Sequence, residues 1–300
     1  MLQMASNPPF LGVVVSILIA DFSGSIGEAA WNAYLGGMSN SNHLLGFLHG
    51  FYGTGALLSH LVASFMITKG GLPWNHFYYF MASIEVLSSV SGFWWSTGVA
   101  YRASVNQHQD EHGTRNKVTM TKVLVTPPFS RVTWLCSFFL LGYVAIEVAI
   151  GGWILVFMTE VRKATQFAAR MTATGFWLGI TLGRFLLCFI YLLLVIALGI
   201  VSWLVPQFLV SAIAFGLQGF LLGPLFPAGI VVMSRLLPRH LHVSAIGFAA
   251  AFGSIGSAVL PFAVGAIAQV KGVPVLQPIV LAILVVILCL WLGLLRCDRK

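Results

Sequence analysis

The sequence has few charged residues, since Asp, Glu, Lys and Arg together occupy 8% of its 300 positions. A soluble domain carries about a quarter of its residues as charged side chains. Apolar residues make up 58% of this chain instead, and its mean hydropathy is +0.92. The shortage of charge excludes a water-soluble globular domain and predicts an all-α, polytopic membrane protein.

Cysteine is also scarce, with four residues in the chain. Cys136, Cys188 and Cys289 lie in apolar stretches, where a thiol behaves as a small hydrophobic group. No disulfide framework is therefore expected. No Lys or Arg precedes the first apolar run, so the N-terminus does not resemble a cleavable signal peptide.

Acidic residues are half as frequent as basic ones, with eight Asp and Glu against sixteen Lys and Arg. Most basic residues lie in segments that connect apolar runs, or at the C-terminus: Arg102, Arg115, Lys117, Lys122, Arg131, Arg235, Arg239, Arg296, Arg299 and Lys300. This distribution is typical of cytoplasmic orientation signals and argues against a nucleic-acid partner. We therefore expect the C-terminus to be cytoplasmic.

Apolar windows of about 20 residues predict transmembrane helices. Nine are expected, at 10–34, 45–67, 75–99, 132–158, 170–189, 190–205, 207–234, 243–269 and 276–295. They divide the chain into a partial N-terminal half of three spans (1–100), a cytoplasmic linker (101–131) and a C-terminal half of about six spans (132–300). Whether 170–205 forms one helix or two stays open, because no turn residues divide it.

A polar stripe crosses the first of these spans. Asp21, Ser25, Glu28 and Asn32 recur at helical spacing and lie on one face. Ionisable groups inside a membrane normally face a bundle interior or a watery cavity. The stripe predicts a proton-coupling or substrate-binding wall. The alternative is that its carboxyls are neutral or paired and hold helices together.

Later spans carry further polar groups. His49 and Tyr52 lie in the second span, and both donate and accept hydrogen bonds, which suits sugar hydroxyls. Glu147 lies deep in a span of the C-terminal half. Asn32 and Gln218 are further hydrogen-bonding candidates, and Trp153 offers a stacking surface. Packing is the alternative for His49, Tyr52 and Trp153.

Several stretches resemble one known family. They are Gly27-Glu28-Ala29-Ala30-Trp31-Asn32-Ala33-Tyr34, Gly46-Phe47-Leu48-His49-Gly50-Phe51-Tyr52-Gly53, Gly142-Tyr143-Val144-Ala145-Ile146-Glu147, Gly183-Arg184, Gly223-Pro224-Leu225-Phe226-Pro227 and the glycine-rich 244–266 segment. Their order and spacing resemble the major facilitator superfamily, in its fungal sugar-permease-like branch related to fucose permeases. The resemblance extends over nearly the whole chain.

The resemblance implies a shortened version of a twelve-helix fold that lacks the first three spans. It also implies alternating access around a central cavity. In fucose permeases the position matching Glu28 carries a proton-coupling acid, and the position matching Glu147 lines the cavity. Arg184 resembles a latch between helices near the cytoplasmic face, and Asp21 is assigned a structural role.

Small residues and prolines suggest how the helices move. Gly219 and Gly223 form a GxxxG pair, and Gly253 lies in a stripe of small residues, so close helix contacts are expected there. Pro227, together with Pro224, predicts an interruption of the span at 207–234.

The polar spans and the resemblance together predict a secondary transporter of a small neutral solute. A sugar is the expected solute, and proton coupling is expected. The protein is expected to be a multi-pass protein of the plasma membrane rather than the vacuole. No cofactor, metal or nucleic acid is expected, and the chain is not expected to be an enzyme. His108, Asp110, Glu111 and His112 fall short of a histidine-box metal site, and no HExxH or GxSxG motif occurs. The remaining alternative is a non-transporting remnant or fragment of a permease.

Overall fold

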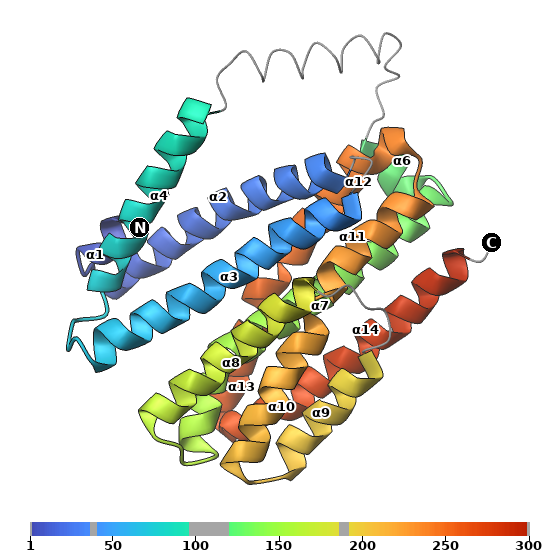
Figure 1. Cartoon of the computed structure of the whole chain (residues 1–300). Helices are drawn as coiled ribbons and strands as arrows, with labels where there is room; N and C mark the ends of the chain where they lie inside the picture. Colours follow the sequence, from blue (N-terminus) through green and yellow to red (C-terminus); the bar gives the residue numbers. More distant parts are fainter. Residues whose placement is uncertain (1, 37–40, 96–119, 186–191, 299–300) are drawn as a thin grey trace. The chain divides into compact units, whose positions relative to one another are not determined.

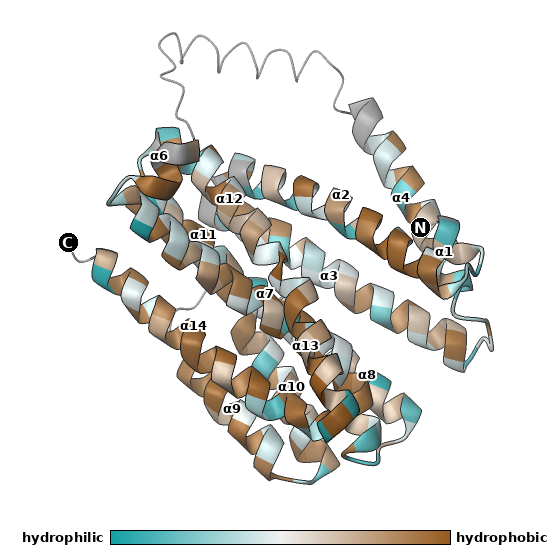
Figure 2. Ribbon diagram, turned by 180° about the vertical axis from the view of Figure 1, so that it is seen from behind, coloured by the Kyte–Doolittle hydropathy of each residue, from teal (hydrophilic) through white to brown (hydrophobic). Residues whose placement is uncertain are grey.

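The computed structural model describes residues 2–36, 41–95, 120–185 and 192–298, and over these ranges the chain is helical with no β-strand (Figure 1). Six helical segments are long and apolar enough to cross a membrane: Phe10–Asn32, His43–Thr68, Phe129–Glu160, Phe208–Leu236, His242–Lys271 and Val273–Cys297. Figure 2 shows long hydrophobic stretches along α2 (Phe10–Gly36) and α9 (Leu192–Leu204), and hydrophilic residues in the turn that follows α7 (Phe129–Glu160). The protein is therefore a multi-pass membrane protein by the length and composition of its helices.

The chain forms two compact units. One comprises Met1–Gly24 and Phe65–Thr119, and the other comprises Ser25–Ser64 and Met120–Lys300. In the first unit, α1 (Leu2–Ala5) contacts α4 (His76–Trp95). The Asn75 side-chain amide, just before α4, donates a hydrogen bond of 2.8 Å to the Ala5 carbonyl oxygen. This bond satisfies a carbonyl at the end of α1.

In the second unit, α7 is the central helix, because it contacts most of the other helices there (Figure 1). These are α6 (Met120–Val125), α8 (Gln166–Phe185), α10 (Phe208–Leu222), α11 (Leu225–Leu236), α12 (His242–Ser254), α13 (Gly256–Lys271) and α14 (Leu276–Asp298). The second unit also contains most of α3 (Ser41–Thr68). Large side chains of α7, among them Phe139, Ile146 and Phe157, are fully buried.

The contacts between helices of the second unit show which of them run in the same direction and which in opposite directions. Gly151 of α7 lies against Trp177 of α8, and Glu147 lies against Arg184, so α7 and α8 are antiparallel. On α8 and α10, Gly179 lies against Gly216 and Gly183 against Phe220, so these two helices are parallel.

The α9 helix is antiparallel to α10. Gln218 of α10 contacts Val195 of α9, whereas Arg162 joins Ser202 of α9 to Ser211 of α10. Because α8 and α10 are parallel and α9 is antiparallel to α10, α8 and α9 are also antiparallel. The segment 170–205 therefore contains two helices, which resolves the alternative left open by the sequence.

Each of the nine expected spans contains a helix, but nine membrane crossings are not confirmed. The helices α4, α8 and α9 are not among the six candidate spans of the described residues. The described part of α9 has 13 residues. In α8, Arg170 and Arg184 lower the hydropathy, and α4 contains Glu85 and several serines.

Two expected boundaries move. The helix expected at 132–158 begins at Phe129, and α6 precedes it, so the expected linker 101–131 contains helix at its end. Residues 96–119 of that region lie outside the described residues.

The expected interruption of the span at 207–234 is confirmed, because α10 ends at Leu222 and α11 begins at Leu225. The span expected at 243–269 is likewise divided at Ile255.

Candidate functional site

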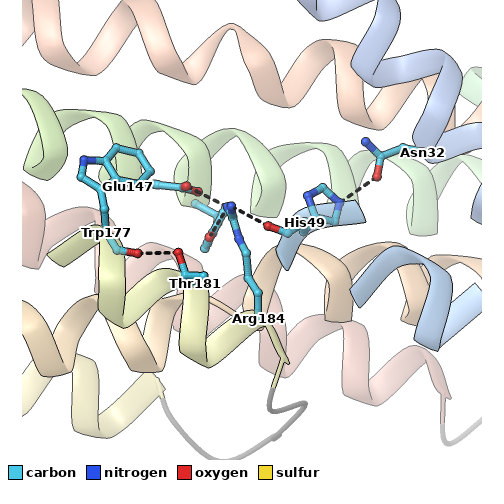
Figure 3. A network of polar contacts seen from close by, with 7 residues as sticks. Asn32, His49, Glu147, Trp177, Thr181 and Arg184 are labelled. Atoms are coloured by element: carbon cyan, nitrogen blue, oxygen red, sulfur yellow. Dashed lines mark hydrogen bonds and ion pairs between the residues drawn. The ribbon is translucent and has the colours of Figure 1, made fainter. Parts of the chain in front are cut away.

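A buried hydrogen bond joins α2 to α3. The Asn32 side-chain oxygen lies 2.9 Å from His49 Nε2, and both residues are buried (Figure 3). Because an amide oxygen only accepts, the bond requires the hydrogen of His49 to be on Nε2. The Asn32 amide nitrogen donates to the Glu28 carbonyl oxygen, also at 2.9 Å. Asn32 therefore orients the histidine from α2.

A buried ion pair joins α7 to α8. Arg184 Nη2 lies 2.7 Å from Glu147 Oε1, and the two side chains are 3% and 7% exposed. Arg184 Nη1 donates to the His49 carbonyl oxygen at 3.2 Å, and Nη2 lies 3.5 Å from the Tyr143 hydroxyl. The guanidinium therefore connects three helices in one polar network (Figure 3).

Aromatic rings surround this network. The Arg184 guanidinium lies 5.1 Å from the centre of the Tyr52 ring, which is the geometry of a cation–π contact. Phe226 of α11 lies 4.6 Å from the His49 ring and 5.8 Å from the Tyr143 ring, between ring centres. The pair itself is buried, and a low local dielectric strengthens its attraction.

Helical spacing explains which side chains meet. Tyr143 and Glu147 are four residues apart on α7 and share a face, as do Thr181 and Trp177 on α8. On α3, Gly53 allows close approach to α8, because a Cβ atom there would lie 2.8 Å from Thr181 Oγ1. The glycine brings His49 and Tyr52 within reach of Arg184.

Glu28 and Asp21, expected on one polar face, have different surroundings. Glu28 is partly exposed and lies within electrostatic range of Glu147 and Arg184. Asp21 belongs to the other compact unit and is exposed. The structure therefore associates Glu28 and Asn32 with the network, and it does not do so for Asp21.

Two further candidates lie away from the network. The Trp153 indole nitrogen donates to the Pro261 carbonyl oxygen at 3.2 Å, and its ring lies over Gly265 of α13. Gln218 is buried against α9, where its amide nitrogen lies 3.4 Å from the Val195 carbonyl oxygen. Neither contact places these side chains beside Glu147 or Arg184.

The expected close-packing residues do make close contacts. A Cβ atom at Gly223 would lie 2.5 Å from the Ile180 carbonyl oxygen, and one at Gly253 would lie 3.0 Å from Leu140 Cβ. Pro227 is buried in α11. The contacts account for the two glycines structurally, and whether the three residues also act in gating stays a prediction.

Sequence reasoning did not foresee the pairing of Arg184 with Glu147, and it did not single out Trp177. Arg184 was expected to act as a latch between helices near the cytoplasmic face. Its guanidinium does connect three helices, and its place relative to the cytoplasmic face stays a prediction. Trp177 shares the face of α8 that carries Arg184, and this spacing was a usable signal. Within the described residues, no cluster of His, Cys, Asp or Glu could hold a metal ion.

A yeast protein is similar to this chain. The chain is 27% identical over 284 aligned positions to "Bypass of stop codon protein 6" of Saccharomyces cerevisiae. The alignment covers 82% of this chain and 56% of the yeast protein, so the chain spans little more than half of that relative. No family model matches the sequence.

Proposed function

We propose that this protein is a secondary transporter of a small neutral solute, a monosaccharide, and that it works by alternating access. The observation that carries the proposal is the buried Glu147–Arg184 pair, bound to the His49 carbonyl oxygen between membrane-type helices. Charged groups are costly inside a membrane, and where they occur they generally mark substrate or ion pathways.

The chemistry of the network favours a neutral, hydroxyl-bearing solute. Glu147 and Arg184 cancel each other's charge, so the site does not attract either sign strongly. Tyr52, Tyr143 and His49 can exchange hydrogen bonds with hydroxyl groups, which both donate and accept. The aromatic rings of the site also suit the apolar faces of a sugar ring.

Nine membrane crossings and membership of the major facilitator superfamily are part of this proposal. The alternation of direction from α7 through α8, α9 and α10 supports crossings by α8 and α9. Helix α8 is covered by α7 and α10, so its arginines need not face lipid. We place the protein in the plasma membrane with a cytoplasmic C-terminus.

Proton coupling is assigned to Glu28. Its carboxyl lies within electrostatic range of Glu147 and Arg184, so a change in its charge alters the balance of the pair. Protonation from one side and release to the other would then favour different arrangements of the helices. Glu147 is the second acid of the site.

The test is uptake by purified protein in liposomes. Radiolabelled D-glucose, D-galactose, D-mannose and L-fucose are supplied with and without an inward proton gradient. We expect gradient-driven accumulation of at least one sugar by the unsubstituted protein. Glu28→Gln should abolish accumulation but leave counterflow exchange, and the matched control Glu85→Gln, at an exposed position of α4, should leave both.

The results separate the parts of the proposal. Undiminished proton-driven accumulation by Glu28→Gln would exclude Glu28 as the coupling residue. The alternative expected from the sequence is a protein that does not transport by itself. Folded protein that moves no solute, sugar or otherwise, would favour this candidate.

A further inference from the structure

Two buried hydrogen-bond donors beside the network have no partner among the described residues. They are the indole nitrogen of Trp177 and Nε of Arg184. The two residues are 7% and 2% exposed, so water does not reach these atoms freely. An unsatisfied buried donor costs about 1–3 kcal/mol, and native structures contain few of them.

Both donors lie on the same face of α8. Successive helical residues turn by about 100°, so positions 177, 181 and 184 fall within about 60° of one another. Figure 3 shows Trp177, Thr181 and Arg184 projecting from α8 on the side where Glu147 lies. The Thr181 hydroxyl already donates to the Trp177 carbonyl oxygen at 2.8 Å.

The two donor side chains reach neighbouring levels of the facing helix, although Trp177 and Arg184 are about two turns apart on α8. The Trp177 ring lies over Gly151, where a Cβ atom would be 2.7 Å from Cζ2, and Arg184 pairs with Glu147. Gly151 and Glu147 are one turn apart on α7, a rise of about 6 Å. One small solute can therefore reach both levels.

The Trp177 ring is held on its other side as well. The His60 ring of α3 lies 5.5 Å from it, centre to centre, with 31° between the ring planes. The His60 ring is itself fixed, because its Nδ1 lies 2.8 Å from the Ala56 carbonyl oxygen. The indole N–H is thus presented by a side chain with little freedom to turn.

We propose that Trp177 is a specificity-determining residue of the transport site, whose indole N–H donates to a hydroxyl oxygen of the solute. The inference rests on the proposed function. Arg184, about two turns along α8, supplies a second donor through Nε, and Glu147 accepts from the same solute. An indole N–H and a guanidinium N–H only donate, so the solute must present acceptor oxygens to both.

The same geometry selects among oxygen-bearing solutes. A carboxylate on the solute would compete with Glu147 for Arg184 and bring a second negative charge into the site. A hydroxyl accepts from Trp177 and can still donate to Glu147. The solute class is therefore a neutral polyol, the monosaccharide of the proposed function.

The experiment measures equilibrium binding by purified protein in detergent. D-glucose, D-galactose, D-mannose and L-fucose are tested first, and then the monodeoxy analogues of the sugar that binds most tightly. The variant Trp177→Phe keeps an aromatic ring and removes the N–H. Trp203→Phe, at an exposed position of α9, is the matched control.

We expect unsubstituted protein to bind one deoxy analogue about fivefold to tenfold more weakly than the parent sugar, since a neutral hydrogen bond contributes roughly that factor. Trp177→Phe should bind the parent about as weakly and should no longer distinguish it from that analogue. Trp203→Phe should retain the full discrimination. Galacturonate should bind more weakly than galactose to unsubstituted protein.

Full discrimination retained by Trp177→Phe would overturn the inference and leave the proposed function intact. Failure of unsubstituted protein to bind any of the four sugars would overturn both. If Trp177→Phe is not monodisperse on gel filtration, Arg184→Lys replaces it, because lysine keeps the charge and lacks Nε. Loss of discrimination at a second hydroxyl in Arg184→Lys would support the two-donor site, and unchanged discrimination would overturn it.

Discussion

Arg184 Nη2 lies 2.7 Å from Glu147 Oε1, and both side chains are buried on antiparallel helices. Removing one member of a buried ion pair leaves the other charge without compensation, which is costlier than removing both. Arg184 also binds the His49 carbonyl oxygen and the Tyr143 hydroxyl. The pair is therefore the point at which a single substitution disturbs three helices.

Glu147→Gln should destabilise the protein, because it leaves the Arg184 guanidinium buried and unpaired. The expected loss is about 3–5 kcal/mol, the usual effect of breaking a buried pair. Thermal unfolding in detergent measures it. Glu160→Gln, at the exposed end of the same helix, should unfold like the unsubstituted protein.

The double variant Glu147→Gln/Arg184→Gln should recover part of the lost stability, since it leaves no buried charge at this position. A double variant less stable than either single variant would contradict the assignment of the pair as the source of the effect. Comparison of the four proteins gives the coupling between the two residues.

The Asn32–His49 hydrogen bond should be measurable as a coupling between α2 and α3. Asn32→Leu and His49→Leu should each reduce stability and solute uptake, and the double variant should lose less than the sum. Hydrogen bonds between membrane helices average about 0.6 kcal/mol, so a coupling of about 0.5–1.5 kcal/mol is expected. Strict additivity would show that the bond does not contribute.

Gly219→Ala should disrupt the contact between α8 and α10. A Cβ atom at Gly219 would overlap the Phe176 carbonyl oxygen, which is backbone and cannot rotate away. Gly175→Ala makes the same change where no atom lies within 4 Å of the new Cβ. We expect Gly219→Ala to aggregate on gel filtration or to lose several degrees of melting temperature in a thermal unfolding assay. Gly175→Ala should behave as the unsubstituted protein in both assays.

Arg162→Ala should loosen the turn between α7 and α8. Arg162 donates to the Ser211 hydroxyl at 2.9 Å and to the Ser202 carbonyl oxygen at 2.6 Å, and it stacks on the Phe157 ring. Loss of these contacts should cost about 1.5–3 kcal/mol and speed hydrogen exchange at the end of α9. The exposed neighbour Lys163→Ala should change neither.

Hydropathy predicted helices at each of the nine expected spans, because a membrane-crossing segment must satisfy its backbone internally and face lipid. It could not decide which of them cross the membrane. Helix α8 shows why, because side chains that are covered by other helices do not face lipid and need not be apolar. Its arginines lower the hydropathy of a helix that is mostly buried in protein.

The candidate site was predictable in part. Asn32, His49 and Glu147 were chosen because polar groups on apolar helices need partners, and the structure gives them partners. Glu147 and Arg184 are 37 positions apart in the sequence and lie on different helices. Sequence alone does not show that their side chains meet in space. The rotation of each helix about its axis is also set by its neighbours, so sequence alone could not show that Trp153 packs against α13.

The contact between α8 and α10 also restricts the route that a solute can take. Gly179 and Gly183 of α8 meet the backbone of α10 at Gly216 and Phe220, so no side chain separates the two helices there. Nothing as large as a sugar ring fits along that seam. For the proposed transport, this leaves the side of α8 turned toward α3 and α7 as the approach of a solute to Arg184.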